Sequence, residues 1–321
     1  MSAPREADSG LGLASAPDLR RAPLEPRALL NGILSAVTWV ASLLAAVPLI
    51  SVLYMLIKRG GARFSLSLFT ELPPAGFEVG GGFGHAILGT IVMIGIASLL
   101  SIPFGVIAAV YLAELGPDHQ VSRAARFAIK TMTGMPSILA GVFAYAAVVL
   151  VTGTYSAPAG GVALAVLMLP TIVLTAEEAL KMVPRITKDA AHGMGCTHTQ
   201  VILKVVLPTA LPGVLTGVML AVARAAGETA PLLFTALFSN FWLIENGRMH
   251  LMQPTASLAV LIYNFSGMPF ENQIELAWAA SLVLVIIVLI VNILSRIFGK
   301  SGGARSLFRL RLVTRSVKKS A

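Results

Sequence analysis

The chain has 321 residues, of which 56% are hydrophobic and only 12% are charged, with a formal net charge of +9 and a mean hydropathy of +0.82. This composition lies outside the usual range of water-soluble globular proteins and inside that of proteins that cross a membrane several times. The single cysteine, Cys196, excludes an intramolecular disulfide framework and any multi-cysteine zinc or iron–sulfur site.

Six apolar segments approach the roughly 17 to 25 residues that a helix needs to cross a bilayer. They predict an all-α, polytopic membrane protein with six transmembrane helices. A disordered leader is expected at residues 1–31 and a basic tail at residues 299–321. Between them we distinguish a first helix with an external loop, 32–83, and a core, 84–298. The six spans cover residues 32–57, 86–112, 132–151, 161–176, 211–227 and 276–297.

Several of the spans contain a proline, and a kink is expected at Pro103, near the middle of the second span. Pro136 lies in the third span and Pro170 in the fourth. Proline removes a backbone donor, so a bend is expected at each, and neighbouring helices would accommodate it. The freed carbonyls could instead line a path through the membrane, which is the less favoured interpretation.

Lysine and arginine are distributed unevenly around these spans. If both termini lie in the cytoplasm, four basic segments are cytoplasmic. They are the leader, the tail, the loop between the second and third spans, and the polar loop before the fifth span. The basic residues left on the opposite side are Lys58, Arg59, Arg63 and Arg248. The positive-inside bias therefore predicts this orientation, and the basic character needs no nucleic acid to explain it. The tail is interpreted as solvated or in contact with lipid headgroups.

A polar segment at residues 189–208, with the sequence DAAHGMGCTHTQVILKVVLP, interrupts the apolar chain before the fifth span. It predicts a short helix around residues 188–194, a chain reversal at Gly195, and a second short helix with Thr197 as its N-cap. The second helix has an apolar face at helical spacing that would need a partner groove. This face is made of Val201, Ile202, Val205 and Val206.

Pro208 is expected to end the polar segment before the fifth span, because the residue before a proline is biased out of the helical region. Three potential metal ligands in the segment, His192, Cys196 and His198, have no matching carboxylate and are interpreted as solvated. By spacing alone, a docking element for another subunit and an ordinary amphipathic cytoplasmic loop are equally good interpretations.

Arg224 and Glu228 lie four residues apart at the end of the fifth span, where one helix face would let them pair. A charge at the bilayer centre costs roughly 2.5 to 3.5 kcal/mol on insertion scales, so it normally faces a bundle interior or an aqueous path. Periodicity alone slightly favours an internal ion pair that fastens the span to a neighbour. The functional alternative is an arginine fork that binds a tetrahedral oxyanion and is oriented by Glu228.

Two patterns resemble those of known transporters. The polar segment resembles the EAA loop of ABC importer permeases, with Asp189 in place of the glutamate. Residues 224–236, RAAGETAPLLFTA, resemble the signature of phosphate ABC importer permeases of the PstA type. Some relatives in that family carry an arginine where this chain has Leu174. The anion path would then depend more on Arg224 and on a partner permease.

The resemblance implies the type I ABC importer permease fold, with a cytoplasmic coupling helix within residues 189–208 and a location in the bacterial cytoplasmic membrane. It places Arg224, Glu228 and Thr229 on the substrate pathway. It assigns coupling to an ATPase to Asp189, Ala190, Ala191, Gly195, Leu207 and Pro208.

The implied partners are a homologous permease of the PstC type, an ATPase dimer of the PstB type and an external phosphate-binding protein of the PstS type, besides inorganic phosphate and the lipid bilayer. The chain itself would bind no cofactor and catalyse no reaction, because ATP and Mg²⁺ belong to the ATPase. The nearest approach to a Walker A sequence, at residues 84–90, lacks the lysine that holds phosphates.

The sequence leaves three other functions open. A permease for another oxyanion, such as sulfate or molybdate, would lack the GETAPLL run. An ion-coupled secondary carrier could use Arg224 and Glu228 as a proton relay, but it predicts internal inverted repeats that the sequence does not display. A structural or sensor subunit without transport would tolerate the loss of Arg224.

Overall fold

The computed structural model describes residues 26–245 and 247–317. The chain separates into two compact units, Met1–Tyr54 and Met55–Ala321. The predicted disordered leader lies outside the described residues as far as residue 25, and the last four residues of the predicted tail lie outside them as well.

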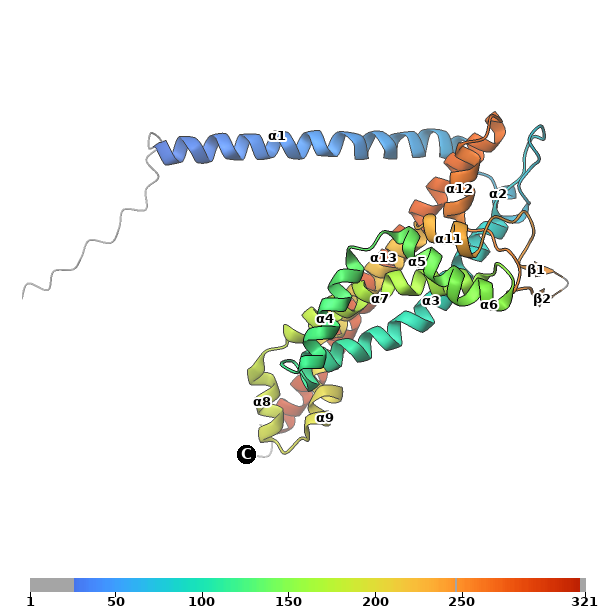
Figure 1. Cartoon of the computed structure of the whole chain (residues 1–321). Helices are drawn as coiled ribbons and strands as arrows, with labels where there is room; N and C mark the ends of the chain where they lie inside the picture. The colour runs from blue at the N-terminus through green and yellow to red at the C-terminus, as the bar shows by residue number, and fades with distance from the viewer. Residues whose placement is uncertain (1–25, 246, 318–321) are drawn as a thin grey trace, which may run out of the picture. The chain divides into compact units, whose positions relative to one another are not determined.

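The described part of the first unit is a single helix, α1 (Pro26–Met55) (Figure 1). Its side chains are apolar around the whole circumference, and nearly all of those described are exposed. A helix of this kind is stable where its surroundings are lipid or another membrane helix.

The second unit is built from helices and one short hairpin, and the segments labelled η are π-helices. In chain order the helices are η1 (Leu56–Gly60), α2 (Ser67–Thr70), α3 (Gly84–Val110), η2 (Tyr111–Leu115), α4 (Gln120–Thr133), α5 (Ser137–Ala144), η3 (Tyr145–Val149), α6 (Leu150–Thr152), α7 (Ala157–Lys181), α8 (Arg185–Gly193), α9 (His198–Val201), η4 (Ile202–Val206), α10 (Leu207–Ala226), α11 (Ala230–Thr235), α12 (Leu258–Ser266) and α13 (Glu271–Val317). The hairpin pairs β1 (Ile244–Glu245) with β2 (Arg248–Met249) in an antiparallel ladder, in which Ile244 lies opposite Met249.

Within the described residues, five helices are long and apolar enough to cross a membrane, and a bent pair of helices would make a sixth. The five are Leu29–Gly60, Gly84–Leu115, Ala157–Lys181, His198–Ala226 and Glu271–Leu294. The bent pair consists of Gln120–Thr133 and Ser137–Thr152, which meet at 107°. The predicted all-α fold with six spans is confirmed, with the third span in two arms.

The third span differs from the continuous helix predicted at residues 132–151. α4 ends at Thr133 and α5 begins at Ser137, so Met132 belongs to the other arm of the bend. The break falls at Pro136, whose ring removes a donor and biases the preceding residue out of the helical region. The bend predicted at Pro136 is thus confirmed, whereas α7 runs without a break through Pro170.

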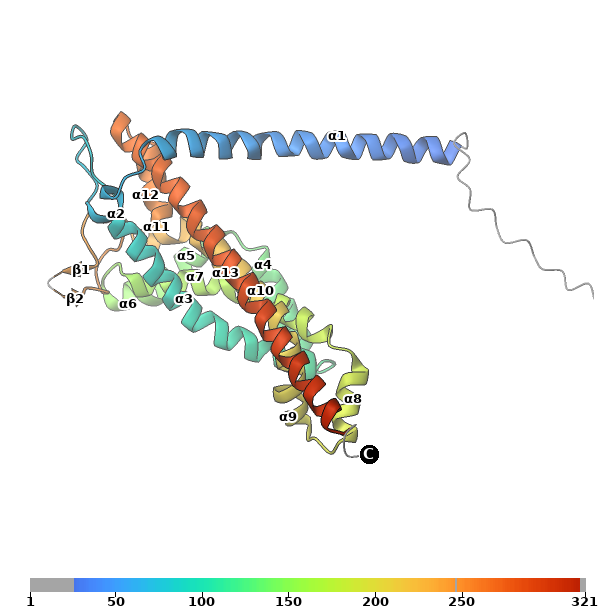
Figure 2. The same cartoon turned by 180° about the vertical axis from the view of Figure 1, so that it is seen from behind.

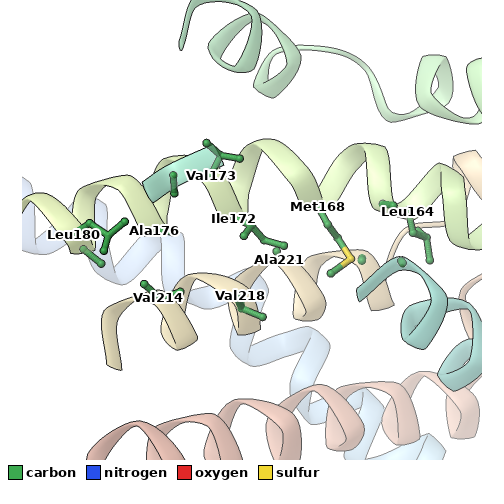
Figure 3. Packing of buried hydrophobic residues seen from close by; sticks show 14 of the residues in the cluster. Leu164, Met168, Ile172, Val173, Ala176, Leu180, Val214, Val218 and Ala221 are labelled. Atoms are coloured by element: carbon green, nitrogen blue, oxygen red, sulfur yellow. The ribbon is translucent and has the colours of Figure 1, made fainter. Parts of the chain in front are cut away.

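The core of the second unit lies where α7 packs between α3 and α10. Buried side chains recur every four residues along α7 (Figure 3) and also meet α3, because Ser101 Oγ lies 3.9 Å from Met168 Sδ and a Cβ at Gly105 would meet Ile172. Gly217 on α10 lets the helices approach closely, since a Cβ there would meet the side chain of Thr175 on α7. The stripe on α7 is Leu164, Met168, Ile172, Ala176 and Leu180, and it shares one buried cluster with Val214, Val218 and Ala221 of α10.

The second unit has two distinct ends. Figures 1 and 2 agree in placing α8 and α9 together at one end, and α2, α12 and the hairpin at the other. We refer to these as the α8–α9 end and the α12 end. α7 and α10 both extend from the α8–α9 end into the core, so the polar segment is attached directly to the two most buried helices.

Candidate functional site

The chain reverses between α8 and α9 as the sequence predicts. Gly195 has φ +86°, in the left-handed region that favours glycine, and Thr197 is the N-cap of α9. A reciprocal capping box closes the turn: the backbone N–H of Gln200 donates to Thr197 Oγ1 at 3.4 Å, and the backbone N–H of Thr197 donates to Gln200 Oε1 at 3.1 Å. The predicted turn and its cap are both confirmed.

The apolar face of the second short helix is covered by the chain itself, which corrects the expectation of an external groove. Val201, Ile202 and Val206 are all buried, as is Ala191 of α8. Val201, Val206 and Ala191 belong to the same buried cluster as the α7 stripe. The polar segment is therefore a rigid extension of the core, and any partner would contact its opposite side.

The opposite side of the polar segment is exposed and carries both polar and apolar side chains. Asp189 and Ala190 are exposed on α8, and Met194 and Ile186 expose 78% and 77% of their surface. Among the described residues no group of three or more His, Cys, Asp or Glu side chains could hold a metal ion. The rings of the two histidines in the polar segment stack on each other, with centroids 5.8 Å apart.

Pro208 does not end a helix, contrary to the prediction. The polypeptide is helical without a break from His198 to Ala226, and Leu207 has helical angles (φ −60°, ψ −46°). The π-helix η4 precedes Pro208 and its wider turn, in which the Leu207 N–H donates to the Ile202 carbonyl, accommodates the proline. Leu207 and Pro208 are therefore half-buried residues inside one long helix.

Arg224 lies in the last turn of α10, and Glu228 follows the helix end at Gly227. The pairing expected from their spacing is present, with Arg224 Nε 3.5 Å from Glu228 Oε1. The Arg224 side chain is 54% exposed and that of Glu228 is 18% exposed. The guanidinium thus keeps donors that no described residue occupies, in a place where an unpaired charge is costly.

Thr229 marks the start of α11, the short helix that follows the pair. Its carbonyl accepts hydrogen bonds from the backbone N–H groups of Leu232 and Leu233. α11 packs closely on α5, because a Cβ at Gly141 would meet the backbone of Pro231. Arg224, Glu228 and Thr229 therefore lie together at a break between two helices that are held by the core.

The structure does not bring the two groups of predicted residues together. Leu207 and Arg224 are joined by 17 helical steps, which corresponds to about 25 Å of α-helix. The polar segment and Arg224 are thus the two ends of one continuous helix. A displacement at one end can therefore be carried to the other along this helix.

Sequence reasoning missed a second set of charges at the α8–α9 end. Glu114 pairs with Lys188, and Glu177 pairs with both Arg126 and Lys181. The spacing of four between Glu177 and Lys181 could have indicated one of these contacts. The other two join residues 51 and 74 positions apart, for which the sequence carries no local signal.

The chain is similar to known membrane transport proteins over most of its length. Residues 101–301 match the model of a protein family described as "binding-protein-dependent transport system inner membrane component". The phosphate transport system permease protein PstA of Pasteurella multocida is 38% identical over 273 residues, which cover 85% of this chain and 95% of that protein. The probable PstA of Methanocaldococcus jannaschii is 34% identical, with coverage of 78% and 86%.

A solved structure supports the fold. In an inward-facing structure of the MetNI methionine ABC transporter, a chain with 20% sequence identity superposes with a TM-score of 0.52, covering 68% of this chain and 93% of that one. This protein therefore has the fold of a type I ABC importer permease. By its family model and by its relatives, the chain belongs to the inner membrane components of binding-protein-dependent transport systems.

Proposed function

We propose that this chain is the membrane permease subunit of an ATP-driven phosphate importer and forms half of its translocation pathway. The observation that carries the proposal is the continuous helix from His198 to Ala226, which has the polar segment at one end and a half-exposed arginine at the other. The names of the relatives that cover most of the chain supply the substrate, phosphate.

Arg224 is the residue we assign to phosphate. A guanidinium is always charged and presents parallel donors that match the oxygens of a tetrahedral oxyanion. Glu228 touches only its Nε, at 3.5 Å, so it orients the fork while leaving the remaining donors free. The carboxylate also repels an anion at short range, which keeps binding weak enough for release. Thr229 lies next to the pair and completes this group of pathway residues.

The exposure of Arg224 requires a neighbour. A side chain that is 54% exposed on an apolar helix would be costly in lipid, so this surface faces an aqueous path or a second subunit. We assign that place to a homologous permease of the PstC type. An external phosphate-binding protein of the PstS type would deliver the anion to the α12 end.

The exposed side of the polar segment is the docking surface for the ATPase in this proposal. Asp189 and Ala190 lie on that side, Gly195 makes the turn, and buried Ala191 anchors the helix to the core. Two copies of a PstB-type subunit would bind ATP and Mg²⁺. Their closure would push on α8 and α9, and transport would follow as an ATP-dependent shift between outward- and inward-open states.

The orientation follows from the distribution of charge. With the α8–α9 end in the cytoplasm, the basic loops flanking α4 and α8 lie on the side that the positive-inside bias favours. We therefore propose a multi-pass protein of the bacterial cytoplasmic membrane with both termini in the cytoplasm. Cysteine labelling at position 77 from outside and at position 194 from inside would check this placement.

Uptake by the reconstituted complex tests the proposal. Vesicles containing this chain, its permease partner, the ATPase and the binding protein should accumulate labelled phosphate only with ATP inside, and excess sulfate should not compete. Competition by sulfate or molybdate would instead indicate another oxyanion as substrate. Uptake driven by a proton gradient without the ATPase would contradict the proposal.

A further inference from the structure

The second set of charges at the α8–α9 end consists of two groups of ion pairs, Glu114 with Lys188 and Glu177 with Arg126 and Lys181, joined through the backbone of η2 by the bond from Arg126 to the Leu112 carbonyl. We call these five residues the charge network. Its members come from four different elements, η2, α4, α7 and α8. Glu177 and Glu114 expose only 5% and 7% of their side chains, so both carboxylates are buried, whereas their partners Arg126, Lys188 and Lys181 reach the surface with 21%, 20% and 50% exposed. Buried charges are costly unless they are paired, and here each carboxylate is paired.

Lys188 makes the connection to the polar segment. Its Nζ donates to Glu114 Oε1 at 2.6 Å, and its side chain is 20% exposed. Lys188 lies on α8, one residue before Asp189, and Glu114 lies in η2, the π-helix that continues α3. The first helix of the docking surface is therefore bonded to the end of a membrane-spanning helix to which it is not adjacent in sequence.

Arg126 makes the connection to α4 and uses all of its nitrogens. Nε donates to Glu177 Oε1 at 2.7 Å, Nη1 to the Pro117 carbonyl at 2.8 Å, and Nη2 to the Leu112 carbonyl at 2.6 Å. Lys181 donates to the same Glu177 oxygen from one turn further along α7. Arg126 thus binds η2, the loop after it and α7 at the same time.

The π-helix η2 explains why a carbonyl is available for Arg126. In the π pattern the backbone N–H of Gly116 donates to the Tyr111 carbonyl, at 3.0 Å. The next donor in that pattern would be residue 117, which is a proline and has no N–H. The Leu112 carbonyl is left without its helical partner, and the Arg126 guanidinium takes that place.

We propose that the charge network is a positioning device that makes α8, the end of α3 and the start of α4 move together. A displacement of α8 would be carried through Lys188 and Glu114 to η2, and from the Leu112 carbonyl through Arg126 to α4 and α7. Without the network, α8 would be held to the core by the packing of Ala191 and not by its ion pair, and part of the same displacement would be absorbed in the loops around α8. This inference rests on the proposed docking of the ATPase at the polar segment.

Reversal of the Lys188–Glu114 pair tests the inference. In the full reconstituted complex, Glu114→Lys and Lys188→Glu should each raise the ATP hydrolysed per phosphate imported by about tenfold, within the range of measured coupling free energies. The double variant, with the two charges exchanged, should return this ratio to within about threefold of the wild type. Subunit assembly, measured by co-purification, should be unchanged in the double variant.

Asp118→Lys is the matched control. Asp118 lies four residues from Glu114, is exposed, and makes no ion pair among the residues the structure describes, so the same change of charge there should leave the ratio unaltered. A single variant that fails to assemble is replaced by the double variant Glu114→Gln with Lys188→Gln. This variant leaves no buried unpaired charge, so it should assemble. It lacks the ion pair, so it should still raise the ATP hydrolysed per phosphate imported.

Two results would overturn the inference: normal coupling in assembled single or neutral variants, or a charge-exchanged variant as poorly coupled as the singles. Failure of the proposed function would look different. If the wild-type complex hydrolyses ATP but moves no phosphate, the substrate assignment fails. In that case the readout is the rate of ATP hydrolysis with and without the binding protein. Glu114→Lys and Lys188→Glu should each lose the stimulation by the binding protein, and the double variant should regain it.

Discussion

Arg126 and Arg224 are in opposite surroundings. Arg126 is 21% exposed and donates to three acceptors between 2.6 and 2.8 Å away, on three parts of the chain. Arg224 is 54% exposed and has one contact at 3.5 Å. An arginine with every nitrogen occupied holds a structure together, whereas one with free donors can bind a ligand. The two residues are both arginines, so their different surroundings, and not the residue type, account for the difference between them.

The largest expected effect comes from removing the exposed arginine. Arg224→Ala should lower phosphate uptake by at least about 100-fold, because charge-assisted hydrogen bonds to the anion are lost while few contacts within the chain are. Labelled phosphate uptake in reconstituted vesicles measures this, with co-purification of the subunits as a check on assembly. Arg123→Ala, which removes an exposed arginine of α4 that makes no ion pair among the described residues, is the matched control. Normal uptake by an assembled Arg224→Ala complex would contradict the assigned role.

The second effect concerns the turn between α8 and α9. Gly195→Val should reduce uptake by about tenfold, because a β-branched residue is strained at φ +86° and would displace the docking surface. Gly195→Asn, which tolerates this conformation better, should stay close to the wild type. Gly193→Val is a control for bulk, since Gly193 is equally open but helical. Equal losses at both glycines would show that side-chain size, and not the backbone, is the cause.

Lysine in place of each arginine sharpens the comparison directly. Arg126→Lys should lower the free energy of unfolding by about 2 kcal/mol, since one ammonium cannot meet three acceptors placed around a planar fork. Arg224→Lys should leave the thermal unfolding midpoint unchanged but reduce phosphate uptake. Calorimetry or thermal unfolding of the purified complex checks the first half, and transport checks the second. Equal stability losses in both variants would remove the distinction drawn above.

The smallest effect is expected at the helix cap. Thr197→Ala removes the acceptor for the Gln200 N–H and should destabilise the protein by about 1 kcal/mol. Thr197→Ser keeps a hydroxyl in the same place and should be nearly neutral. A thermal unfolding series on the three proteins measures the difference. A serine variant as unstable as the alanine variant would point to the lost methyl group rather than the cap.

The features that could be predicted from sequence are those with a local cause. Apolar runs predict the spans because lipid demands them over a fixed length, and Gly195 with Thr197 predicts the turn because its backbone angle and cap are short-range requirements. The i, i+4 spacing of Arg224 and Glu228 predicts their contact for the same reason. Local rules therefore supplied most of the fold and the geometry of the candidate site.

The features that were missed depend on tertiary contacts or on rarer helical geometry. Arg126 and Glu177 are 51 residues apart and meet only after α4 has packed against α7. Pro208 was expected to end a helix, but the π-helix before it removes the clash and lets the helix continue. The covering of Val201 and Val206 by the chain's own core was missed because periodicity shows that a face is apolar, not what covers it.

The π-helix η4 affects the direction in which the proposed docking surface points. A five-residue π segment holds one residue more than the α-helical path it replaces, and each residue turns an α-helix by about 100°. α9 and Arg224 lie on the same long helix, on either side of η4. The surplus residue therefore sets how far the side chains of α9 are rotated about the helix axis relative to Arg224. Loss of a single residue within η4 would keep the helix continuous and redirect the docking surface by roughly a quarter of a turn. The one surplus residue of η4 therefore sets, in this chain, the direction of the proposed docking surface separately from the α10 span.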